Sequence, residues 1–411
     1  MDIHYLITDN IDYPVHESHL LIHYSSEPTT KKAFVIHPQG LLFENDIRQQ
    51  SINIFKFDSL FDEKEKVTAF FKTANASFPF DIFSAIFFLL SRYEEYWPHQ
   101  KDSYGRYAHE NAIAFQHGFL HLPLINCWLA EFRKSLHQTG VLLLFKPNIF
   151  KAGLTYDIDI AWSYLNKGLL RNFGGFIKRP SWERIQVLLG KKQDPFDCYD
   201  FLISLHKKID EEAICFFPLA ENTGLYDKNI DPQRWEMQQL VDKMHHRFTI
   251  GLHPSWHSHA HPEALTNELN TLEKIVREPV VHSRQHYIKF DLPSTYQRLS
   301  DIGIRKDYSM GYGSINGFRA SFAGSFFWYD LSNETQTLLE LHPFCFMDAN
   351  SHYEQKQSLE DTKQELEHYL SVCKKYKGEF ISIFHNNFLG TGKEFKGWRE
   401  LYLHLISQLR Q

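Results

Sequence analysis

The segment AGLTYDIDIAW, residues 152–162, is a short apolar run that contains two closely spaced aspartates near its end. Further apolar runs follow it along the chain, each separated from the next by a stretch with helical periodicity. These runs are EAICFFPLA (212–220), FTIGLHP (248–254), VVHSRQHY (280–287), GIRKDYSM (303–310) and GEFISIFHNN (378–387). Strand–helix alternation of this kind predicts a parallel sheet, either open or closed into a barrel.

The pattern is different before about Pro147, where short strand-like runs lead into two helical stretches, around residues 80–97 and 122–137. A chain of 411 residues is also too long for one ordinary core. We therefore expect a smaller α+β domain in residues 1–147 and a larger α/β domain in residues 148–411.

The composition argues against several classes of protein. The formal charge is −6, so general nucleic-acid binding is not expected. The N-terminus has neither a basic n-region nor a continuous apolar stretch, and no segment has enough apolar residues to span a bilayer. The five cysteines are scattered and lack CxxC spacing, which fits a reducing compartment. These features predict a cytoplasmic protein without a signal peptide or transmembrane helix.

One segment, residues 166–193, is locally basic. Its basic residues are Lys167, Arg171, Lys178, Arg179, Arg184, Lys191 and Lys192. This composition is compatible with binding of an anionic lipid head group or a sugar phosphate and, more simply, with a solvated helical face.

Polar side chains gather where the predicted strands of the larger domain end. They are Asp157 and Asp159, then His253, then Arg284, His286 and Tyr287, then Asp307, and finally His385. In β/α barrels the active site lies at the carboxyl ends of the strands. Because five strands place polar residues at the same edge, the sequence predicts an enzyme.

Four histidines occur close together in GLHPSWHSHAHPE, residues 251–263. Pro254 suits the first position of a helix, so His253 and His257 would form an i,i+4 pair whose rings face the same side. Such a pair can chelate a divalent metal, and a carboxylate from another strand would leave a further position open for water. His259 and His261 fall outside this register and fit a solvated loop.

The two aspartates of TYDID can supply that carboxylate. Alternate residues of a strand point to the same side, so Asp157 and Asp159 can both face the mouth of the sheet. One carboxylate can then bind the metal while the other acts as a base. The alternative is a pair of capping or loop carboxylates.

The ordered segments LTYDID, ICFFPLA, GLHPSWH, SRQHY, GIRKDYS and ISIFHNN resemble the polysaccharide deacetylase family, the family 4 carbohydrate esterases. Members of this family are distorted β/α barrels that remove N- or O-acetyl groups from sugars with a divalent metal, usually zinc. The resemblance covers residues 151–387. It implies a distorted parallel (β/α) barrel of about seven strands. FFLLSRYEEYW and GRYAHENAIAF resemble the uncharacterised N-terminal domain of a bacterial subgroup.

The resemblance also implies roles for the first residues of the site. Asp157 matches the family's base. Ile158 stands where the family's metal-binding Asp is found, so Asp159 takes the ligand role after a shift of one residue. His253 and His257 match the family's histidine ligands. Arg284 matches the arginine that orients the base.

Four further residues complete the expected site. His385 matches the general acid of the last motif, and Asp307 is the best match for the acid that holds it protonated. Tyr287 matches the family's tyrosine and is expected to contact substrate. His286 replaces the family's proline. It fits a substrate contact or a metal ligand, and equally a buried, hydrogen-bonded histidine.

These residues imply a metal-dependent hydrolase that removes acetyl groups from a saccharide or glycan precursor, with zinc as the expected ion. Partners in envelope biosynthesis would fit such an activity. Two alternatives remain open at this point. The altered first motif fits a barrel that binds saccharides without hydrolysing them, and related barrels hydrolyse other C–N amides.

Overall fold

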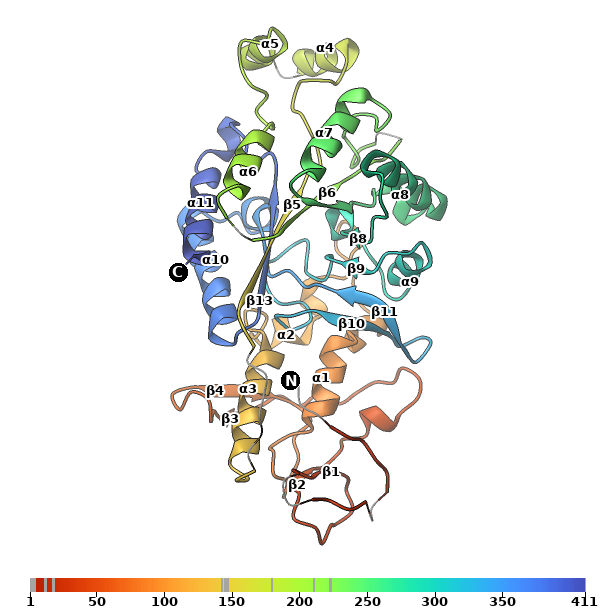
Figure 1. Ribbon diagram of the computed structural model, residues 1–411, viewed down its shortest axis with the longest axis vertical. Helices are drawn as coiled ribbons and strands as arrows, with labels where there is room; N and C mark the ends of the chain where they lie inside the picture. The colour runs from red at the N-terminus through yellow and green to blue at the C-terminus, as the bar shows by residue number, and fades with distance from the viewer. Residues whose placement is uncertain are drawn as a thin grey trace.

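The computed structural model describes residues 5–10, 13–16, 19–141, 143, 148–178, 180–209, 211–221 and 224–410. The molecule is elongated, with strands β1 (Ile22–Tyr24) and β2 (Phe34–Ile36) near one end of its long axis. Helices α4 (Leu169–Lys178) and α5 (Trp182–Leu188) stand at the other end (Figure 1). The expected domain boundary at Pro147 lies outside the described residues.

Within the described parts of the chain, nine strands form one sheet in the order β10-β11-β9-β8-β7-β6-β5-β13-β12. They are β5 (Lys151–Asp157), β6 (Ala213–Phe217), β7 (Thr249–Leu252), β8 (His282–Ser283), β9 (Lys306–Asp307), β10 (Phe326–Asp330), β11 (Thr335–Leu341), β12 (Phe346–Met347) and β13 (Glu379–His385). Every pairing is parallel except that of the β10–β11 hairpin. The α/β class is as expected. Among the described residues, however, β10 and β12 do not pair with each other, so no closed barrel is seen.

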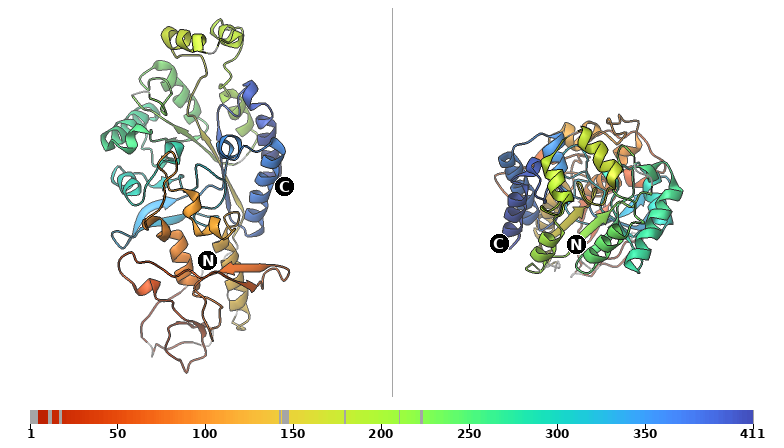
Figure 2. Two further views of the ribbon diagram at one scale, coloured as in Figure 1. Left: turned by 180° about the vertical axis from the view of Figure 1, so that it is seen from behind. Right: turned by 90° about the horizontal axis from the view of Figure 1, so that it is seen from above.

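Helices of the larger segment flank the sheet (Figures 1 and 2). They are α6 (Tyr199–His206), α7 (Trp235–His245), α8 (Pro262–Val276), α9 (Ser294–Asp301), α10 (Leu359–Lys375) and α11 (Trp398–Leu409). Helix α7 shows why they pack there. Its buried residues, Met237, Leu240, Val241 and Met244, recur at the i, i+3, i+4, i+7 spacing that makes one apolar stripe.

The two longest central strands are buried, and their pairing positions part of the site. In β5 the last four residues are buried and in β13 the last six are, as expected for parallel strands covered on both faces. Their register pairs seven residues and ends with His385 opposite Asp157. The carboxyl ends of both strands therefore carry a polar residue at the same edge of the sheet.

The N-terminal segment has its own aromatic core. It contains β1 and β2, the antiparallel pair β3 (Phe55–Asp58) and β4 (Lys66–Ala69), and helices α1 (Ile82–Leu90), α2 (Ile113–Gln116) and α3 (Leu124–His137). Phe70, Phe80 and Trp128 pack at its centre. Buried contacts also join this segment to the larger one, because Arg319 pairs with Glu95 at 2.6 Å. Across the part of the chain that the structure describes, no helix has both the length and the apolar character needed to cross a bilayer.

Candidate metal centre and active site

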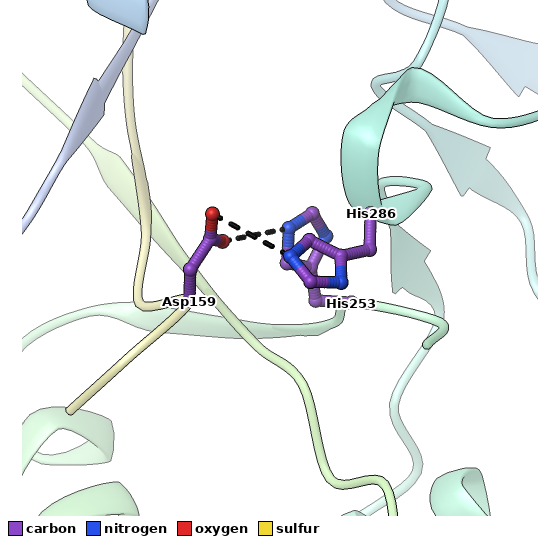
Figure 3. Close-up of side chains that lie close together, drawn as sticks. All are labelled: Asp159, His253 and His286. Carbon is purple, nitrogen blue, oxygen red and sulfur yellow. Dashed lines mark hydrogen bonds and ion pairs between the residues drawn. The ribbon is translucent and has the colours of Figure 1, made fainter. Parts of the chain in front are cut away.

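Asp159, His253 and His286 converge at the carboxyl edge of the sheet, with one ligand atom of each within 4.8 Å of the other two (Figure 3). His253 directly follows β7, while Asp159 and His286 lie shortly after β5 and β8. The Nε2 atom of His253 is 3.2 Å from Oδ1 of Asp159, and that of His286 is 3.5 Å from Oδ2. One carboxylate and two imidazoles are a common ligand set for zinc and similar divalent ions.

Hydrogen bonds on the far side of each ring fix the two imidazoles. Nδ1 of His253 donates to the carbonyl oxygen of Arg284, and Nδ1 of His286 donates to Oδ1 of Asp227 at 3.0 Å. With Nδ1 used as a donor, a neutral ring has its lone pair on Nε2, which faces Asp159 in both cases (Figure 3). Such outer partners are typical of metal-binding histidines. The residues present therefore fit a divalent ion.

The charges of the cluster favour an ionised Asp159. Burial raises the pKa of its carboxyl, but His286 and His385 more than compensate and hold that pKa well below its usual value. For His286, burial disfavours the charged ring, yet Asp159 and Asp227 raise its pKa to about 9. A divalent ion bound through Nε2 would replace the proton of this histidine.

His257 lies outside the cluster. We expected a helix to begin at Pro254 and to present His253 and His257 together. Instead His253 ends a strand, and a 3-10 turn begins at His257; the helix α8 starts only at Pro262. The backbone N–H of His257 donates to Oδ2 of Asp227, and its ring stacks on His261 with centroids 4.1 Å apart. We therefore replace His257 by His286 in the proposed ligand set.

Asp157 is held beside the cluster by Arg284. Nη1 of Arg284 lies 2.7 Å from Oδ1 of Asp157, and both side chains are buried. Arg284 is itself fixed, because Nε donates to the carbonyl of Tyr308 and its guanidinium lies over the ring of Phe216 at 4.4 Å. The second oxygen of Asp157 lies 3.7 Å from Nε2 of His253. The expected pairing of Asp157 with Arg284 is thus present.

His385 pairs with Asp348, a residue that the sequence analysis did not identify. Nδ1 of His385 lies 2.6 Å from Oδ1 of Asp348, whose other oxygen accepts the backbone N–H of His385 at 2.7 Å. Nε2 lies 3.6 Å from Oδ2 of Asp159. Burial disfavours the imidazolium, but Asp348 and then Asp159 raise the pKa of His385 well above its ordinary value. His385 is therefore protonated near neutral pH and faces the cluster.

Asp307, the expected partner of His385, has a different environment. It is fully buried and accepts hydrogen bonds from the hydroxyl of Ser283 at 2.8 Å and from the backbone and hydroxyl of Ser309 at 2.8 and 2.9 Å. Burial raises its pKa to about 6. Strand β9, which contains Asp307, is separated from β13 by four strands in the sheet. Asp307 therefore holds the backbone after β8 and β9 in place. Asp348, and not Asp307, is the carboxylate that pairs with His385.

Four half-buried rings gather beside the metal cluster: Tyr104, Tyr226, Trp256 and Tyr287. Tyr226 stacks on Trp256 at 4.1 Å, and the ring of Tyr287 is 4.6 Å from that of His286. Tyr104 comes from the N-terminal segment and lies 5.6 Å from Tyr287. A small cavity lined in part by Asp159, Asp227 and His286 lies at the same edge. The rings give this edge an apolar surface next to the polar cluster.

The contact with the N-terminal segment also fixes the backbone beside His286. Tyr287 has a φ of 59°, an unfavourable left-handed conformation for a tyrosine. Nη1 of the buried Arg106 donates to its carbonyl oxygen at 2.8 Å, and Asp102 holds Arg106 through Nε at 2.6 Å. A second hydrogen bond joins the same two segments in the other direction: Nζ of Lys289 donates to the carbonyl oxygen of Tyr104 at 2.7 Å.

Residues 1–140 match a family of unknown function (DUF7033), which agrees with an N-terminal domain of uncharacterised role. A search of curated proteins found no match.

Several solved structures are similar to part of this chain. One is described as a polysaccharide deacetylase from Mycobacterium smegmatis, with 11% identity, 65% of this chain and 86% of that chain covered, and a TM-score of 0.42. The allantoinase Puue has 9% identity, coverage of 64% and 84%, and a TM-score of 0.40. A polysaccharide deacetylase from Bacillus cereus has 11% identity, coverage of 63% and 88%, and a TM-score of 0.33. The function proposed below rests on the residues of the site.

Proposed function

We propose that the protein is a metal-dependent hydrolase that removes acetyl groups, N- or O-linked, from a saccharide or a glycan precursor. One observation carries this proposal. Two imidazoles anchored through Nδ1 converge on the carboxylate of Asp159, between an Arg-held carboxylate, Asp157, and a protonated imidazole, His385. A ligand set flanked by a base and an acid is the arrangement that acyl hydrolysis requires.

Asp159, His253 and His286 would hold the divalent ion, with zinc as the expected ion. When bound, the ion supplies Lewis acidity toward a carbonyl oxygen and lowers the pKa of a water molecule. Asp157 accepts the proton of the attacking water, and the hydrogen bond from the Arg284 guanidinium orients this carboxylate. His385 donates its Nε2 proton to the departing amine or sugar oxygen.

The aromatic rings favour a saccharide over other acetylated compounds. Tyr104, Tyr226, Trp256 and Tyr287 lie beside the metal cluster and are partly exposed. Flat apolar ring faces pack well against the C–H faces of a sugar. Tyr287, which was expected to contact substrate, is the member that lies next to His286.

The test combines two measurements on the full-length protein. We expect elemental analysis to find about one divalent ion per chain, and we expect acetate release from at least one member of a panel of N- and O-acetylated saccharides. A protein without a bound ion after incubation with excess zinc would refute the proposal. Metal and saccharide binding without acetate release would favour the saccharide-binding alternative. Release of amine from a non-acetyl amide alone would favour the other C–N hydrolases.

A further inference from the structure

Helices α4 and α5 project from one end of the long axis, away from the sheet and its flanking helices (Figures 1 and 2). None of the described α4 side chains is buried, and in α5 only Val187 is. Six large apolar side chains of these helices and their flanks are 64–89% exposed: Leu169, Leu170, Phe173, Ile177, Trp182 and Leu189. An exposed apolar group of this size in one short segment marks a contact surface.

The apolar residues of α4 form a single stripe. Leu169, Leu170, Phe173 and Ile177 are spaced i, i+1, i+4 and i+8, which places them within about one third of the helix circumference. Lys178 lies about 80° around the helix from Leu170, just outside the stripe. A ten-residue helix with its apolar stripe in water is only marginally stable, so a partner that covers the stripe would stabilise it.

The polar contacts of the segment leave this stripe free to bind. Where the α4–α5 segment joins the rest of the protein, the carboxylate of Asp194 accepts hydrogen bonds from the backbone N–H groups of residues 163–165. Between the helices, Nη1 of Arg184 donates to the carbonyl of Asn172 at 3.1 Å. These contacts connect α4 to α5 and both to the body of the protein through polar groups rather than through the apolar side chains.

The charge of the segment indicates the partner. Residues 166–193 contain seven Lys or Arg and a single acidic residue, Glu183, in a chain whose formal charge is −6. Large apolar side chains with basic residues around them are the signature of helices that lie in the interface of an anionic bilayer. A protein partner that covers only an apolar stripe would not need this local excess of positive charge.

We propose that the α4–α5 segment binds the surface of an anionic lipid bilayer, with its apolar stripe in the head-group boundary and its lysines on the lipid phosphates. This inference goes beyond the proposed deacetylation and does not depend on it. The segment follows β5, which ends at Asp157 two residues before Asp159, so it leaves the sheet at the edge that holds the candidate metal centre.

Vesicle sedimentation of the full-length protein tests the proposal. The probes are phosphatidylcholine vesicles with and without roughly one third phosphatidylglycerol. We expect binding to the anionic vesicles that weakens as salt rises, because salt screens the lysines. The triple variant Leu169→Ser, Leu170→Ser, Phe173→Ser should lower partitioning by at least about a hundredfold. The double variant Lys178→Glu, Lys191→Glu should lower it by about tenfold or more.

A matched control removes exposed apolar side chains elsewhere. Phe43, Phe327 and Leu338 are 67%, 50% and 72% exposed, and the triple variant to Ser should bind vesicles like the native protein. Circular dichroism and metal content should be unchanged in all variants. Absence of binding to anionic vesicles, or equal loss in the control, would overturn the proposal. So would dissociation of a dimer by the α4 variant in light scattering, which would identify the stripe as a self-association surface.

Discussion

Nδ1 of His286 lies 3.0 Å from Oδ1 of Asp227, and the same carboxylate accepts the backbone N–H groups of Trp256 and His257. Asp227 therefore connects the loop after β6, the turn after β7 and the histidine after β8. By holding Nδ1, it turns Nε2 of His286 toward Asp159. An outer carboxylate of this kind orients a ligand and raises its basicity.

Asp227→Asn should weaken metal binding by about 10–100-fold while the fold remains intact. The amide keeps the shape of the carboxylate but removes the negative charge that faces Nδ1 of His286. Competition with a chromogenic chelator measures the change in affinity. Asp231→Asn, on the exposed part of the same loop, is the control and should leave the affinity unchanged. If both variants bound the metal as tightly as the native protein, Asp227 would only hold the loop in place and would not support the metal ligand.

His286→Ala and His257→Ala should differ sharply in metal content. His286 supplies a ligand atom to the cluster, whereas the ring of His257 stacks on His261. We expect His286→Ala to lose the ion on dialysis and His257→Ala to retain it, as measured by elemental analysis. The reverse result would restore the His253–His257 pair predicted from the sequence and would exclude the ligand set proposed here.

Metal uptake should depend on pH because the ion and a proton compete for His286. Burial disfavours the charged ring, but Asp159 and Asp227 raise the pKa of His286 to about 9. Below that pH the proton must leave before Nε2 can bind the ion, so apparent affinity should rise with pH, by up to about tenfold per unit for one proton released. Zinc titrations between pH 6 and 9 would show this slope. A flat profile would remove His286 from the ligand set.

The parts of the fold and site that could be predicted are those with a strong local pattern. Strands β5 and β13 lie in segments rich in apolar residues, so their positions and the polar residues at their ends follow from the sequence. The role expected for His257 depended instead on where a helix begins. Pro254 and Pro262 both follow a histidine and both suit the first position of a helix, and only the three-dimensional structure shows that α8 begins at the second.

Asp227 and Asp348 could not be found because their local sequence carries little signal. Asp348 follows β12, a strand of two residues, which is too short to show periodicity. Its position directly after an apolar pair, before Ala349 and Asn350, was the only available indication of a strand end. Asp227 lies in an irregular loop, and its partner His286 is 59 residues away in the chain. The order of the strands in the sheet brings such distant residues together, and the local sequence does not show this order.

Asp348→Asn should shift the high-pH limb of activity toward neutral pH. Asp348 provides the largest of the charge interactions that raise the pKa of His385, so without this charge the imidazolium loses its proton at lower pH. His385 acts as an acid only while protonated, and activity is therefore lost as pH rises through its pKa. The profile of kcat/KM against pH for native protein and variant measures the shift. A variant that is equally impaired at every pH would indicate a purely structural role for Asp348.

Asp157→Asn and Asp159→Asn should separate the base from the ligand. Asp157 is held by Arg284 at 2.7 Å, whereas Asp159 faces both His253 and His286. Asp157→Asn should keep the metal and lower the rate of acetate release by about 10²–10⁴-fold, because an amide cannot accept the proton of water. Asp159→Asn should lose metal affinity and recover part of its activity in excess zinc. The opposite assignment would follow if Asp157→Asn lost the ion and Asp159→Asn retained it. If neither variant changed metal content or rate, both carboxylates would be structural, and the metal-dependent mechanism would fail.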